Sequence, residues 1–271
     1  MWFRGPDFTP SLTIGKESNV SSVRFGKNRL GLIALCCLGA AVAMSTAAWA
    51  ESKSSGYKPT SEFEKRDIEG WTVHVEKTLV EEHPEIGPKA LRILKNQLYR
   101  ISRAVPGEVL KKIRKVPIWI QYRCKDRKCA EYHPTARWLR EHGQNPEKAK
   151  CVDIANAENF VEWTRTLRWM MLHEMAHAYH DRVLGFDHPG VKAAYERAKK
   201  SGKYDEVLHW TECHARHWGL TNHKEFFAEM TETYFGTNEY FPFVRAELKG
   251  HDRKTYDLLA EVWDAKSDEG D

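Results

Sequence analysis

His173, Glu174 and His177 form a His-Glu-x-x-His sequence whose residue types and spacing could hold and use a metal ion. Residues four apart on a helix lie on the same face, so both imidazoles can point at one ion. Zinc accepts imidazole ligands, and a catalytic zinc keeps one position for water. Glu174 could take the proton of that water as it attacks a carbonyl. The alternative is a pair of surface histidines on an ordinary core helix.

A third protein ligand for zinc must come from elsewhere in the chain. The compact pattern H-E-x-x-H-x-x-G-x-x-H is absent, because the residues three and six after His177 are His and Val. Downstream, Glu225 is the candidate ligand, and Glu229, one turn later, could accept a hydrogen bond from a ligating histidine. Two alternatives stay open: Glu225 could support a helix cap at Asn222, or Glu225, Glu229 and Glu232 could form a solvated acidic face.

The two segments together resemble the gluzincin metallopeptidases. The likeness is closer to the catalytic domain of anthrax toxin lethal factor and to related uncharacterised bacterial secreted proteins. It is carried by the His-Glu-x-x-His sequence and by Glu225-Phe-Phe-Ala-Glu229, and in the secreted proteins also by residues 132–134, 185–189 and 220–225. The resemblance implies a zincin-like fold with a zinc ion as cofactor.

The same resemblance assigns roles to individual residues. It implies that His173, His177 and Glu225 bind the zinc, that Glu174 is the general base, and that Glu229 supports a ligand. It also implies that the strand at residues 152–154 is the edge strand along which an extended peptide lies.

One departure from that family concerns the oxyanion. Lethal factor-like domains place a tyrosine seven residues before the ligand glutamate, and here that residue is Trp218. An indole N–H donates a hydrogen bond but does not give up a proton in the same way. Either His214, His217 or His223 takes the role, or catalysis is slower. We therefore expect a zinc endopeptidase, with a zinc-stabilised binding module of little or no activity as the alternative and hydrolysis of a non-peptide amide as a further possibility.

The first fifty residues predict export. A basic polar segment precedes the uncharged apolar run of residues 30–43, and Ala48-Trp49-Ala50 is a signal-peptidase pattern. We expect a signal peptide over residues 1–50 and a secreted, periplasmic or cell-envelope protein. The run is short for a spanning helix, and an uncleaved membrane anchor is the alternative.

Charge argues against nucleic acid as a partner. The leader holds five of the 42 Lys+Arg and two of the 38 Asp+Glu, so 37 basic and 36 acidic residues remain after cleavage. A net charge near zero gives no electrostatic basis for binding nucleic acid. We expect a peptide or protein substrate instead, and the oligomeric state stays open.

Four cysteines remain after cleavage, which is compatible with two disulfides in an exported chain. We favour Cys124–Cys129 and Cys151–Cys213 among the three possible pairings. A zinc knuckle would need paired C-x2-C spacings, which the chain lacks.

The elements that must position the motifs form a mixed succession. Alternating or apolar runs predict strands over residues 71–75, 116–122 and 152–154. Apolar stripes at helical spacing predict helices over residues 86–105, 191–201, 222–236 and 254–263, and one long helix from Asn156 through His177. Strands first and helices later indicate an α+β fold, with a flexible lead-in (51–62) and a single zincin-like domain (63–271).

Overall fold

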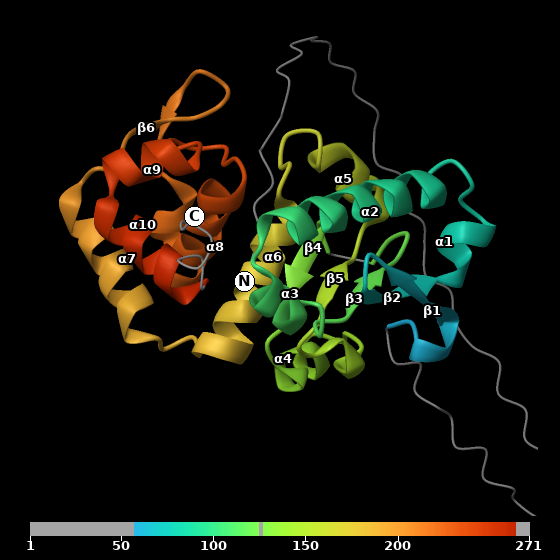
Figure 1. Ribbon diagram of the computed structural model, residues 1–271. Helices are drawn as coiled ribbons and strands as arrows, with labels where there is room; N and C mark the ends of the chain where they lie inside the picture. The colour runs from blue at the N-terminus through green and yellow to red at the C-terminus, as the bar shows by residue number, and fades with distance from the viewer. Residues whose placement is uncertain (1–56, 125–126, 264–271) are drawn as a thin grey trace, which may run out of the picture. The chain divides into compact units, whose positions relative to one another are not determined.

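A five-stranded mixed sheet lies in the first part of the chain, and a group of helices follows it (Figure 1). The computed structural model describes residues 57–124 and 127–263, so the predicted signal peptide lies outside the described residues. Within that part of the chain, no helix is long and apolar enough to cross a membrane. The described residues all fall in one compact unit, and the expected α+β class is confirmed.

The sheet has the strand order β1-β2-β3-β5-β4. The central strands β2, β3 and β5 run parallel, and the two outer strands pair antiparallel to their neighbours. The bounds of the strands are β1 Phe63–Ile68, β2 Trp71–Glu76, β3 Ile118–Ile120, β4 Ala130–Tyr132 and β5 Val152–Ile154. All residues of β3 and β5 are buried, as expected for inner strands covered on both faces.

The three strands predicted from the sequence are present, and the other two strands of this sheet are missing from that prediction. Strand β1 includes Glu64, Lys65, Arg66 and Asp67, so its polar composition concealed it. Strand β4 has only three residues. Pro117 directly precedes β3, where its carbonyl accepts a hydrogen bond from Val152 N–H at 3.0 Å. The proline therefore sits where its missing N–H costs no ladder bond.

The helices pack around this sheet and against one another. Amphipathic α2 buries Ala90, Leu94, Leu98 and Ile101. The α-helices are α1 Lys77–Glu81, α2 Gly87–Ala104, α3 Gly107–Ile113, α4 Ala136–Glu141, α5 Ala157–Trp163, α6 Met170–Tyr179, α7 Pro189–Ser201, α8 His223–Phe235, α9 Arg245–His251 and α10 Arg253–Val262. Shorter elements are the 3₁₀ turns η1 Thr60–Glu62, η2 Pro146–Lys148 and η4 Trp218–Thr221, the π-helical turn η3 His180–Leu184, and a small hairpin of β6 Val207–Leu208 and β7 His214–Ala215.

The predicted long helix from Asn156 to His177 is wrong, because it is two helices. Asn156 does cap α5 by accepting a hydrogen bond from Asn159 N–H. The helix then ends where the hydroxyl of Thr164 donates to Phe160 O at 2.6 Å and that of Thr166 donates to Trp163 O at 3.2 Å. Such bonds from threonine to its own backbone compete with the helix.

Helix α6, which contains the His-Glu-x-x-His sequence, is buried along its whole length and packs against α8. The end of α8 fits the start of α6 closely. A Cβ atom at Gly236 would come within 2.1 Å of the indole of Trp169, the residue that precedes α6. Only glycine allows this approach, which fixes the two helices beside each other.

The expected disulfides are wrong. Cys124, Cys129, Cys151 and Cys213 are all free. Cys129 is buried and its sulfur lies 3.6 Å from that of Met170, while Cys213 is exposed on the β6–β7 hairpin. The tertiary structure therefore places these thiols in different surroundings.

Candidate metal centre

The two histidines of α6 point at one place. Their Nε2 atoms lie 3.1 Å apart, with the rings nearly perpendicular at 79°. The four-residue spacing puts both side chains on the same face of the helix. Both residues are buried, so their ring nitrogens are removed from bulk water.

Glu225 brings a carboxylate to the same place from α8. Its Oε2 lies 3.2 Å from Nε2 of His173 and 3.6 Å from Nε2 of His177. Asn222 fixes the start of α8 by accepting hydrogen bonds from the backbone N–H groups of Lys224 and Glu225. The predicted cap and the predicted ligand position thus occur together.

The spacing of these three atoms fits a metal ion. Metal–ligand distances of about 2.0–2.1 Å in a tetrahedral zinc site require ligand atoms about 3.3–3.4 Å apart. The three observed distances between these atoms, 3.1, 3.2 and 3.6 Å, bracket that value. Two imidazoles and one carboxylate are also a donor set that zinc accepts with one position left open. Burial acts to raise the pKa of Glu225, but His177 and His173 hold it well below its usual range.

Glu232, and not Glu229, is the hydrogen-bond partner of His173. The Nδ1 atom of His173 lies 2.7 Å from Oε1 of Glu232, but 3.6 Å from the nearest carboxylate oxygen of Glu229. The hydrogen bond expected from Glu229 is therefore made by Glu232. The sequence held a usable signal, because Glu232 is seven residues after Glu225 and two helical turns return almost to the same face.

Glu229 has a different environment. Its carboxylate and its backbone carbonyl both accept hydrogen bonds from the amide of Asn238, at 2.8 and 3.1 Å. Burial, and then the charge of Glu232, raise the pKa of Glu229 to about 8. Glu225, Glu229 and Glu232 are each less than 9% exposed, which excludes the alternative of a solvated acidic face.

Glu174 faces the edge of the sheet. Its Oε2 accepts a hydrogen bond of 2.7 Å from the backbone N–H of Tyr132 in β4. Burial raises the pKa of Glu174 to about 8, with His173 acting in the opposite direction. A carboxyl group whose pKa lies near neutrality is suited to accept and return a proton.

The edge strand beside this site is β4, and the expectation that residues 152–154 form it is wrong. Strand β5 lies between β3 and β4 and pairs with both. At the two ends of β4, His133 N–H and the carbonyls of Cys129 and His133 bond with the β5 side. Because successive residues of a strand alternate, Tyr132 presents its backbone groups to the free edge, where Glu174 lies.

The residues considered for the oxyanion role are spread over different surroundings. Trp218 begins η4, which packs on α8. Ring Nε2 of His223 bonds to the carbonyl of Phe186 at 2.8 Å, and Nδ1 of His217 accepts from Gly219 N–H at 3.0 Å. His214 is exposed on β7. The structure therefore brings together His173, Glu174, His177 and Glu225, and engages His217 and His223 elsewhere.

Comparison of the chain with protein-family models, curated proteins and solved structures found no match.

Proposed function

We propose that this chain is a zinc-dependent peptidase of the zincin type. The observation that carries the proposal is the convergence of two imidazole nitrogens and one carboxylate oxygen at tetrahedral spacing, beside a buried glutamate. His173, His177 and Glu225 would hold the ion. Zinc bound there would supply Lewis-acid polarisation of a substrate carbonyl and of a water molecule.

Glu174 would act as the general base. Its carboxylate is next to the proposed ligands in the chain and is anchored at one oxygen by Tyr132 N–H. The other oxygen receives no hydrogen bond from the described residues, so it can take a proton from water and pass it to the leaving amine. Glu232 would keep the proton of His173 on Nδ1 and leave Nε2 as the ligand atom.

The free edge of β4 would align the substrate. Backbone groups of an edge strand can pair with an extended peptide, which gives affinity for peptides of many sequences. Because Tyr132 N–H is already bonded to Glu174, a peptide would pair with the other outward backbone groups of this edge and would pass the proposed base. The predicted leader would place this activity outside the cytoplasm.

The test is a comparison of the zinc-loaded wild-type chain with Glu174→Gln on a complex peptide library. New peptide termini should appear with the wild type and be at least about 10²-fold fewer with Glu174→Gln, while both proteins retain one equivalent of zinc. Glu261→Gln, a change at an exposed glutamate of α10, is the matched control and should cleave like the wild type. A folded, zinc-loaded wild type that makes no cuts would contradict the proposal and favour a zinc-stabilised binding module.

A further inference from the structure

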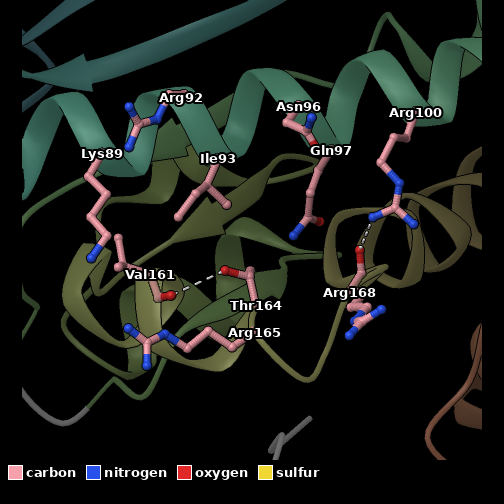
Figure 2. A pocket seen from close by; sticks show the side chains of 10 residues that line it. All are labelled: Lys89, Arg92, Ile93, Asn96, Gln97, Arg100, Val161, Thr164, Arg165 and Arg168. Carbon is pink, nitrogen blue, oxygen red and sulfur yellow. Dashed lines mark hydrogen bonds between the residues drawn. The ribbon is translucent and has the colours of Figure 1, made fainter.

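A pocket of about 410 Å³ lies between α2 and the segment that joins α5 to α6 (Figure 2). We call it the basic pocket, and its volume is in the range of small-molecule sites. It is lined by Lys89, Arg92, Ile93, Asn96, Gln97, Arg100, Val161, Thr164, Arg165 and Arg168. None of these residues belongs to the candidate metal centre.

The lining carries five positive charges and no carboxylate. Arg165 pairs with exposed Glu162 at 3.4 Å, but Lys89, Arg92, Arg100 and Arg168 form no ion pair within residues 57–124 and 127–263. Like charges gathered in one hollow repel one another and raise the local concentration of anions. Burial, and then the charge of Arg168, lower the pKa of Arg100. The pocket thus has an excess of positive charge that an anion would relieve.

Two of the donors are held in place before any ligand arrives. Gln97 is 5% exposed, and its Oε1 accepts a hydrogen bond from Met171 N–H at 3.0 Å. That bond leaves the amide NH₂ directed from α2 toward the residues on the opposite wall (Figure 2). Arg100 stacks on the indole of Trp169 at 4.1 Å and donates to Arg168 O at 3.0 Å. Donors fixed in this way lose little conformational entropy when they bind.

We propose that the basic pocket binds a small organic anion bearing phosphoryl groups. Guanidinium groups match the geometry of phosphate oxygens and donate charge-assisted hydrogen bonds to them. The amide of Gln97 adds neutral donors at the buried wall. Ile93 and Val161 give the pocket an apolar surface that can contact the carbon part of such a ligand.

Occupancy of the pocket would stabilise the start of α6. Gln97 is bonded to Met171 and Arg100 to the backbone just before Trp169, and the carbonyl of Trp169 accepts from His173 N–H at 3.0 Å. A ligand that binds the folded chain and not the unfolded one raises the melting temperature with concentration. Thermal stability is therefore a second measure of binding, independent of any peptidase activity.

The experiment titrates the full chain with inorganic pyrophosphate by calorimetry, with citrate as a carboxylate of comparable charge. The test variant is Lys89→Gln/Arg92→Gln. The control is Lys95→Gln/Arg103→Gln, which removes one lysine and one arginine from exposed positions of the same helix outside the pocket. Pyrophosphate should bind saturably and raise the melting temperature. The test variant should bind about tenfold more weakly or worse, and the control within about twofold of the wild type.

Three results would overturn the proposal. Pyrophosphate binding that does not reach saturation would show that the pocket does not select phosphoryl groups. Equal weakening in both double variants would assign the binding to overall charge, and no weakening in either would assign it to another site such as the candidate metal centre. Tighter binding of citrate than of pyrophosphate, lost in the test variant, would assign the pocket to carboxylates.

Discussion

Nδ1 of His173 and a carboxylate oxygen of Glu232 lie 2.7 Å apart in the buried interface between α6 and α8. This contact fixes which nitrogen of the imidazole carries the proton and which can bind a metal. We predict that Glu232→Gln lowers zinc affinity about 10–100-fold, because such partners set the tautomer and basicity of a ligating histidine. Competition with a chromophoric chelator measures the change.

Glu229→Gln is the matched control for that variant, since it makes the same change one turn away. Glu229 is 3.6 Å from His173 and is bonded to Asn238. Glu229→Gln should therefore lower zinc affinity clearly less than Glu232→Gln does. If Glu229→Gln weakened zinc binding more than Glu232→Gln, the assignment of the two glutamates would be reversed.

The buried ion pair of Lys148 and Asp153 supports β5. Nζ of Lys148 lies 2.8 Å from Oδ1 of Asp153 and 3.0 Å from Oε1 of Gln121, and both charged side chains are at most 3% exposed. Burial acts to raise the pKa of Asp153, but Lys148 and His133 hold it at about 2. We predict that Asp153→Asn lowers the free energy of unfolding by about 3–5 kcal/mol, because it leaves a buried ammonium without its charge partner.

Urea denaturation at neutral pH measures that loss. Glu141→Gln breaks the exposed pair of Arg137 and Glu141, in which the side chains are 87% and 54% exposed, and should leave stability nearly unchanged. Equal stability of wild type and Asp153→Asn would show that the buried pair does not contribute.

The burial of His217 predicts that the protein loses stability in acid. It is 1% exposed, its Nδ1 accepts from Gly219 N–H, and its Nε2 has no hydrogen-bond partner among the described residues. Burial, and then His251, lower the pKa of His217 to about 3. The unfolded chain binds this proton below about pH 6.5 and the folded chain does not. The contribution of neutral His217 to the free energy of unfolding is therefore fully present above about pH 6.5 and is lost as the pH falls toward 3.

We expect His217→Gln to reduce the slope of unfolding free energy against pH by up to about 1.4 kcal/mol per unit between pH 4 and 6. Glutamine can still accept from Gly219 N–H. His142→Gln, at an exposed histidine, should keep the wild-type slope. An unchanged slope in His217→Gln would mean that His217 does not enter the folded state neutral.

The free cysteines predict selective alkylation. Burial raises the pKa of Cys151 to about 11 and raises that of Cys129 further, whereas Cys213 is exposed. Iodoacetamide added to the native protein at pH 8 should label Cys213 first and Cys129 only after unfolding, since the thiolate is the reactive form. Peptide mass mapping reads the labels. A cross-linked peptide pair containing Cys151 and Cys213 would instead restore the expected disulfide.

The sequence by itself determined the local features of this protein. The four-residue spacing puts His173 and His177 on one helical face, and Asn222 marks the start of the helix that carries Glu225. The apolar stripe of α2 and the continuous apolar run of β3 likewise depend on near neighbours in the chain. These predictions succeeded because helix and strand periodicity is a property of short segments.

Only the tertiary structure decided which distant groups meet. The strand order makes β4, and not β5, the edge beside Glu174. The packing of α6 on α8 selects Glu232 over Glu229, and it rests on the contact of Gly236 with Trp169. The same folding leaves Cys151 and Cys213 free. Such choices depend on how elements dock, to within an ångström and a few degrees of helix rotation. A local pattern, such as the seven-residue spacing of Glu225 and Glu232, marks candidates but does not decide between them.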